Sequence, residues 1–198
     1  MTLSIEQELL TEIVDRFRQR ICVGDGEKIN RKLYFREAGR TGLPKWCGFA
    51  AGAAAYLALA RRPDNPWHGR DDLLQFAFDA GDRLLIDHAD VGRTQVKPNH
   101  FTIFPLTSLY ELAAVHAGAK RRAQWRELMV RNLKQVDRLI DRTWATLGKP
   151  GPYAGTGPNH IFGWLAVGYG QAKALHDAPR MRRYEKAFLK HLTIQAPG

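Results

Sequence analysis

Three segments of this chain are apolar or small-sided on nearly every side, and each begins with a proline. They are residues 44–61 (PKWCGFAAGAAAYLALAR), 98–116 (PNHFTIFPLTSLYELAAVH) and 158–176 (PNHIFGWLAVGYGQAKALH). Proline suits the first turn of a helix, where its missing N–H is not needed. The segments are long for strands and show no alternation of apolar and polar residues. We expect three helices that are buried on more than one side.

Amphipathic segments separate these apolar ones. The clearest covers residues 125–147, where apolar residues recur at three- and four-residue steps and basic residues fill much of the remainder. Residues 70–88 and 179–192 show the same pattern over shorter lengths. At the N-terminus, Ser4 and Gln7 have the spacing of a capping box, ahead of about twenty residues with helical periodicity. The chain is therefore predicted to be all-α, with outer amphipathic helices alternating with inner apolar ones.

The inner segments resemble copies of one unit. Their prolines, Pro44, Pro98 and Pro158, are 54 and 60 residues apart, which matches a helical hairpin with its loops. The loops before them also share a pattern, as Gly39-Arg40-Thr41, Gly92-Arg93-Thr94 and Gly155-Thr156. We interpret residues 1–198 as a single helical domain of repeated helix pairs, which form an arc or part of an (α/α) toroid. The repeat units are expected at about 25–88, 89–147 and 148–195, with a kink or irregular turn at Pro105.

Charge and composition narrow the classes of partner and location. The 198 residues include 30 lysines and arginines against 20 aspartates and glutamates, giving a formal net charge of +10, which favours an anionic partner. No apolar run resembles a membrane-spanning helix, and the segment MTLSIEQELL lacks the basic start and apolar stretch of a secretory signal. We therefore expect a cytoplasmic protein with no membrane partner. Cys22 and Cys47 are too few for a disulfide scaffold or a four-cysteine zinc site.

Two of the inner segments place Asn-His directly after the proline, as Asn99-His100 and Asn159-His160. If the copies are equivalent, both pairs lie at the same end of neighbouring inner helices. The loops expected at that end contribute Arg40, Arg93, Tyr153 and Thr156. Asn donates hydrogen bonds, Arg supplies fixed positive charge, and His and Tyr can transfer protons. Such a set suits proton abstraction from a carboxylate-bearing substrate, although capping asparagines and structural histidines remain an open alternative.

On these residues the chain resembles the α/α-toroid polysaccharide lyases, with alginate lyases and heparinase-type enzymes as the nearest examples. The resemblance covers roughly residues 35–195 as architecture. It implies an enzyme that cleaves an acidic, uronate-containing poly- or oligosaccharide by β-elimination. Asn99 and Asn159, with help from Arg93, would stabilise the carboxylate. Arg40 and Thr156 would assist substrate binding. His100 or His160 would take the proton, and Tyr153 would protonate the leaving oxygen. Such toroids have more inner helices than these three, so the chain corresponds to about half a ring.

Two other functions remain open. Toroid-type glycoside hydrolases need acidic catalysts, for which Glu37, Asp90 and Glu111 are the candidates. A non-catalytic helical-repeat module would instead bind a protein or an anionic polymer on its concave face. Exposed inner-helix surface at the ends of an arc would also favour self-association.

The sequence gives weaker signals for other kinds of site. Cys47 opens an apolar helix and resembles the nucleophile of NlpC- or CHAP-type peptidases, but its apolar surroundings fit an inert, packed thiol better. We expect no metal and no cofactor, because the histidines are scattered and no phosphate-binding loop is present. The basic faces carry no motif for specific nucleic-acid binding.

Overall fold

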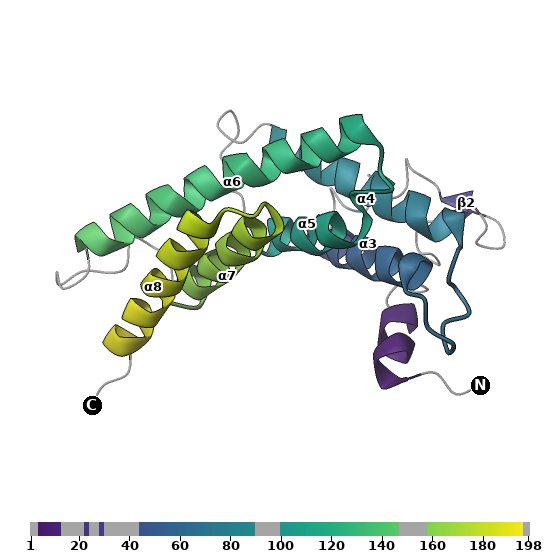
Figure 1. Cartoon of the computed structure of the whole chain (residues 1–198), viewed down its shortest axis with the longest axis horizontal. Coiled ribbons are helices and arrows are strands. Elements are labelled where there is room, and N and C mark those ends of the chain that lie inside the picture. The colour runs from purple at the N-terminus through teal and green to yellow at the C-terminus, as the bar shows by residue number, and fades with distance from the viewer. Residues whose placement is uncertain are drawn as a thin grey trace. The chain divides into compact units, whose positions relative to one another are not determined.

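The computed structural model describes residues 4–12, 22–23, 28–29, 44–89, 100–146 and 158–195, with side chains for 4–12, 51–82, 103–142 except 105, and 161–192. Its helices are α3 (Pro44–Leu59), α4 (Asp71–Ala89), α5 (His100–Ala113), α6 (Ala119–Thr146), α7 (Pro158–Ala174) and α8 (Ala178–Gln195) (Figure 1). Residues 5–12 are also helical. Two short strands, β1 (Cys22–Val23) and β2 (Lys28–Ile29), pair antiparallel, with Cys22 opposite Ile29. Across the described residues the fold is thus all-α apart from this one strand pair, as predicted.

The helix starts follow the local signals. Pro44 and Pro158 are the first residues of α3 and α7, where a proline costs no intrahelical hydrogen bond. Pro105 lies in the second turn of α5, and the helix continues on both sides of it, which excludes an irregular turn there. Its neighbours Ile103 and Leu106 are buried in the core, and this packing holds the helix together across the missing bond.

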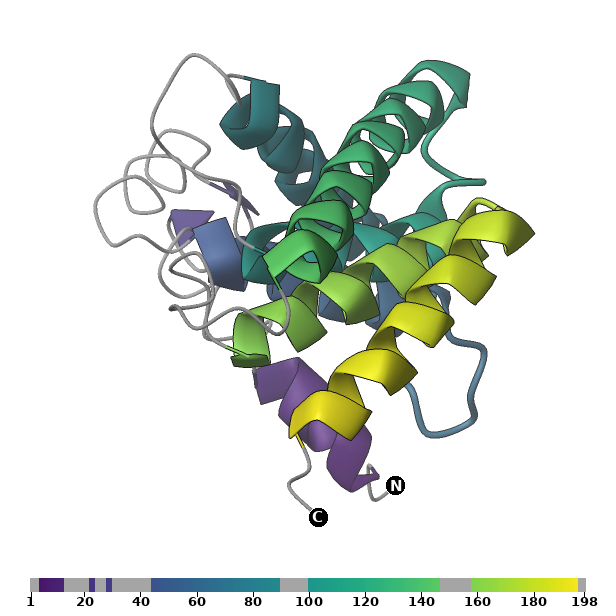
Figure 2. The same cartoon turned by 90° about the vertical axis from the view of Figure 1, so that its left-hand side faces the viewer.

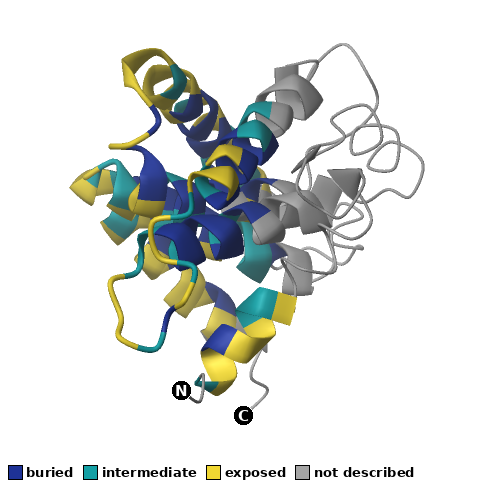
Figure 3. Cartoon of the chain, turned by 90° about the vertical axis from the view of Figure 1, so that its right-hand side faces the viewer, coloured by how far each residue is buried: buried dark blue, intermediate teal, exposed yellow. Residues whose placement is uncertain are grey.

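The chain divides into two compact units, Met1–Trp125 and Arg126–Gly198. In the first unit α3 packs along both α4 and α5. Figure 3 shows buried residues along the faces on which these helices meet. The packing is close because the inner surface of α3 is made of small side chains, with Ala51, Ala53, Ala54, Ala55 and Ala58 all buried.

The loop between α3 and α4 is held in place by one buried amide. The Asn65 side chain donates hydrogen bonds to the carbonyls of Leu57 (2.8 Å) and Ala60 (2.9 Å) and accepts one from the N–H of Trp67 (3.1 Å). The two carbonyls lie at the C-terminal end of α3, where intrahelical donors run out. Asn65 therefore caps α3 and fixes the loop in one step.

The N-terminal helical segment attaches to the same loop. Ser4 Oγ accepts a hydrogen bond from the N–H of Gln7 (3.3 Å), as the capping-box spacing predicts. The Gln7 side chain does not complete the box, because it is fully buried and its amide bonds to Asp64 instead. This contact joins residues 57 positions apart and anchors the segment to the first unit.

In the first unit, α4 and the start of α6 are joined by a carboxylate. Asp82 accepts hydrogen bonds from Arg121 Nε (3.0 Å) and Trp125 Nε1 (3.3 Å). The Arg121 guanidinium also lies over the Phe78 ring, 5.0 Å from its centroid. Gly81 on α4 lies next to this cluster and packs against the side chains of Leu109 and Trp125.

In the second unit, α7 and α8 form an antiparallel hairpin and lie side by side (Figures 1 and 2). The core of this unit consists of residues of α6, α7 and α8, namely Leu133, Val136, Ile140, Ile161, Leu165, Ala172, Tyr184 and Ala187.

A carboxylate also joins two helices of the second unit. Asp137 on α6 accepts hydrogen bonds from Arg180 Nε (3.0 Å) and the Tyr184 hydroxyl (3.0 Å), both on α8. Gly168 makes room for Tyr184 and Val136, since an added Cβ would lie 2.9 Å from each.

Candidate functional site

The Asn-His positions lie at the beginnings of helices. His100 is the first residue of α5, and Asn159 and His160 are the second and third residues of α7. First-turn N–H groups have no intrahelical acceptor, and the positive end of the helix dipole favours a nearby anion. An anion at either helix start would therefore be stabilised by the backbone.

The remaining predicted site residues are not placed by the structure. Asn99, Arg40, Arg93, Tyr153 and Thr156 lie outside the described residues, and so do the side chains of His100, Asn159 and His160. The side chain of Cys47, in the first turn of α3, is likewise outside them. Their roles stay predictions.

Of the three acids of the hydrolase alternative, the structure describes one. Glu37 and Asp90 lie outside the described residues. Glu111 is an exposed residue in the last turn of α5, eleven residues after His100 and thus about 16 Å further along the helix axis. Glu111 therefore lies at the opposite end of α5 from His100, and its part in a hydrolase site stays a prediction. The apolar pattern places a residue on a helix without saying which end faces a site.

The most elaborate polar cluster surrounds Asp137, and the sequence did not suggest it. Besides Arg180 and Tyr184, Asp137 contacts Arg183 (3.3 Å), which also reaches Asp141 (2.7 Å). Burial raises the pKa of Tyr184 above its ordinary value, and the negative charge of Asp137 and its hydrogen bond raise it further. A phenol held protonated this firmly, and bonded to a carboxylate neutralised by two arginines, is a poor acid catalyst. These contacts fasten α8 to α6.

A second arginine contact extends this cluster to the turn before α8. Arg180 Nη1 bonds Asp177 (2.6 Å), whose carboxylate also accepts a hydrogen bond from the Arg180 backbone N–H. Hydrogen bonds to Asp137 and Asp177 raise the pKa of Arg180. Burial acts to raise the pKa of Asp177, but the hydrogen bonds from Arg180 outweigh it and lower that pKa overall. Both groups stay charged at neutral pH.

The second unit also buries three polar side chains, those of Asn132, Gln171 and His191. The side chain of Asn132 on α6 donates to the Gln171 side chain on α7 (2.7 Å), and both residues are almost fully buried. Asn132 Oδ1 and Gln171 Nε2 have no hydrogen-bond partner among the described residues. His191 on α8 is also buried, its ring 4.6 Å from that of Phe162, and burial lowers its pKa. It is therefore neutral at pH 7.

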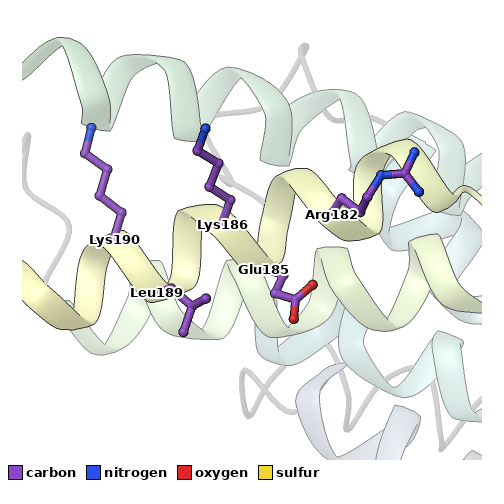
Figure 4. A pocket seen from close by; sticks show the side chains of 5 residues that line it. All are labelled: Arg182, Glu185, Lys186, Leu189 and Lys190. Carbon is purple, nitrogen blue, oxygen red and sulfur yellow. The ribbon is translucent and has the colours of Figure 1, made fainter.

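Exposed cations mark two helix faces of the second unit. On α6, Arg126, Lys134 and Arg138 are exposed, and within the described part of the chain none of them forms an ion pair. On α8, a shallow, open hollow is lined by Arg182, Glu185, Lys186, Leu189 and Lys190. Figure 4 shows the three cationic side chains leaving α8 along one flank and Glu185 and Leu189 along the other.

Other kinds of site find no support in the described residues. Among them, no three His, Cys, Asp or Glu side chains come close enough together to hold a metal ion. Nor does any helix within the described ranges have the length and apolar character needed to cross a membrane.

Comparison with known proteins gives no family. No protein-family model matches the chain, and neither the curated proteins nor the solved structures contain a match. A function has to be argued from the residues themselves.

Proposed function

We propose that this protein is a carbohydrate-active enzyme that cleaves an acidic, uronate-containing poly- or oligosaccharide by β-elimination. The observation that carries the proposal is the Pro-Asn-His sequence at the beginnings of two apolar helices, α5 and α7. A helix start supplies backbone donors for an anion, and Asn and His supply the amide and the base. The net charge of +10 favours the same class of substrate.

A helix-pair array that curves toward an α/α toroid is the architecture we propose for this chemistry. It is supported by a cluster that recurs in the two units. In the first unit Asp82 meets Arg121 and Trp125, and in the second Asp137 meets Arg180 and Tyr184.

The two clusters agree in detail. Each pairs an Arg with an aromatic residue four positions later on the next amphipathic helix, with Arg Nε on Oδ2 and the aromatic donor on Oδ1. Equivalent acids and arginines are 55 and 59 residues apart, close to the proline spacings of 54 and 60. Recurrence at this period is typical of repeated helix pairs.

In the proposed reaction, Asn99 and Asn159 hold the uronate carboxylate, with Arg93 adding positive charge. His100 or His160 removes the proton from the carbon that bears the carboxylate, and the electron pair moves into the carboxylate as an enediolate. As this intermediate collapses, a carbon–carbon double bond forms and the glycosidic carbon–oxygen bond at the neighbouring carbon breaks. Tyr153 protonates the departing oxygen, so that one unsaturated and one saturated chain end result.

The test is an ultraviolet assay for unsaturated uronate with alginate, hyaluronan, heparan and pectic substrates. We expect absorbance to rise with one of them and kcat/KM to fall at least about 100-fold in His100→Ala or His160→Ala, the usual cost of losing a general base. His116→Ala, which truncates an exposed histidine just beyond α5, is the matched control and should retain activity. Turnover that is unchanged in both His100→Ala and His160→Ala would refute the proton-transfer step.

A non-catalytic module that binds an anionic polymer is the second candidate, and the exposed cations of α6 favour it. Arg126, Lys134 and Arg138 project from one helix without acidic partners in the described part of the chain. If this candidate holds, the same polysaccharides should bind with strong salt dependence and without any product. A saturated product, lost on replacement of an Asp or Glu, would point to a hydrolase instead.

A further inference from the structure

The N-terminal helical segment presents an apolar surface to solvent. Ile5 and Leu9, one turn apart, are 77% and 57% exposed. Gln7 on the opposite side is fully buried and bonded to Asp64, so the orientation of the segment is fixed by its attachment to the first unit. Glu8 and Glu12, both exposed, follow one flank of the Ile5–Leu9 pair. We call Ile5, Leu9, Glu8 and Glu12 the acidic face.

The solvent side of α8 is its chemical counterpart. Leu189 and Leu192 are 56% and 43% exposed, on the side of the helix away from the buried Tyr184, Ala187 and His191. Arg182, Lys186 and Lys190, at four-residue spacing, follow one flank of this apolar surface (Figure 4). We call Leu189, Leu192, Arg182, Lys186 and Lys190 the basic face; Glu185 also lies beside Leu189, so three cations stand against one acid here.

We propose that the acidic face of one copy of this chain docks on the basic face of a second copy. Ile5 and Leu9 pack against Leu189 and Leu192, while Glu8 and Glu12 lie toward the cations. Four-residue spacing of charges on both helices matches one turn to one turn, so an apolar strip flanked by acids meets an apolar strip flanked by bases. This inference is independent of the proposed enzymatic function, because neither face contains an Asn-His residue.

The same charges disfavour contacts between two like faces. Two basic faces brought together would place Arg182, Lys186 and Lys190 against their own copies, and two acidic faces would oppose carboxylates. Like charges in contact disfavour both pairings. The contact therefore joins unlike faces, so two copies can close as a reciprocal pair with two such contacts or add head-to-tail.

The proposed contact is small. Two or three helical turns on each side cover less than a standard protein–protein interface of about 1,600 Å². Association should accordingly be weak, dependent on protein concentration, and weaker at high salt, where exposed ion pairs are screened.

Sedimentation velocity of the whole chain over a range of concentrations tests this. At low salt we expect the average mass to rise with concentration and to fall back when salt is added. Glu8→Lys and Lys186→Glu should each weaken association by about tenfold, since each turns an attraction into a repulsion. The double variant Glu8→Lys/Lys186→Glu should associate like the wild type, and an equimolar mixture of the two single variants should associate more strongly than either alone. Leu189→Ser should weaken association without any charge change.

Controls separate this contact from general stickiness. Lys173→Glu reverses an exposed lysine on α7 outside the basic face and should leave association unchanged. Circular dichroism of each variant should show the wild-type helix content. A monomer at all concentrations overturns the proposal. So does a monomer in which Glu8→Lys and Lys186→Glu lower the melting temperature and the double variant restores it, because the two faces would then meet within one chain.

Discussion

Gly81 lies so close to Trp125 that a Cβ atom added to it would stand 2.7 Å from Cζ2 of the indole, and 2.5 Å from Cδ2 of Leu109. Real side chains do not tolerate such distances, so Gly81→Ala forces the indole and Leu109 to move. We expect a loss of about 1–3 kcal/mol in the free energy of unfolding, the usual cost of overpacking a core. Urea denaturation measures it.

Gly52→Ala is the matched control for this prediction. Gly52 also lies within a helix of the first unit, but its added Cβ would meet Ser108 Cβ at 3.6 Å, an ordinary contact. Replacing an unstrained helical glycine by alanine should raise stability by about 0.5–1 kcal/mol. If both variants changed stability in the same direction, the close packing around Gly81 would not be what sets the effect.

Removing the hydroxyl of Tyr184 tests the fastening of α8 to α6. Tyr184→Phe deletes the hydrogen bond to Asp137 and should cost about 1 kcal/mol. Asp137→Ala also strips Arg180 and Arg183 of a shared acceptor, and should cost about 2–3 kcal/mol even though Asp177 and Asp141 remain. The double variant should cost less than the two losses added together. Strict additivity in urea denaturation would show that the hydroxyl and the carboxylate do not interact.

Because His191 is buried, we expect the protein to lose stability on acidification. Burial lowers the pKa of this histidine in the folded state, while in the unfolded chain it stays near 6.5. As the pH falls below about 6.5 the unfolded state takes up a proton that the folded state refuses, so the free energy of unfolding decreases. His191→Leu should show a smaller decrease between about pH 7 and pH 5 than the wild type, by chemical denaturation at each pH. An unchanged pH dependence in His191→Leu would contradict the prediction.

The helices of this protein could be predicted from the sequence because their signals are local. Proline in a first turn and a three- to four-residue apolar period each act within a dozen residues, and they place α3, α4, α5, α7 and α8 to within a few positions. The long helix was expected to begin at Trp125, where its apolar stripe starts, but α6 begins at Ala119. Residues 119–124 carry good helix formers without a stripe, and Gly118, with φ of 75°, provides the left-handed turn ahead of them.

The clusters around Asp82 and Asp137 could not be predicted in the same way. Their partners lie 39 to 47 residues away on other helices, and one aspartate on an amphipathic surface resembles any other in sequence. The candidate site has the same limit. Local signals place His100, Asn159 and His160 at helix starts, but contacts between distant segments are not encoded in any local pattern.

For the buried amides of Asn132 and Gln171 we expect the single and the double replacement to change the free energy of unfolding in opposite directions. Asn132→Leu or Gln171→Met alone leaves the other amide buried with no partner and should cost about 1–3 kcal/mol. Replacing both should be neutral or stabilising, because an apolar pair has no polar atoms to satisfy. Thermal and urea denaturation of the two single variants and the double variant check this. A double variant less stable than either single one would be the contrary result.

The same two amides also favour one register of α7 along α6. If α7 slid along α6 by one turn, about 5.4 Å, the leucines, alanines and valines of the interface would find similar neighbours, but both amides would be sealed in hydrocarbon with nothing to bond. The observed alignment keeps the one hydrogen bond between the two side chains, which such a slide would break. The double apolar variant should therefore have at least the wild-type free energy of unfolding. Its α6–α7 interface should nevertheless sample neighbouring alignments, which would broaden its amide resonances.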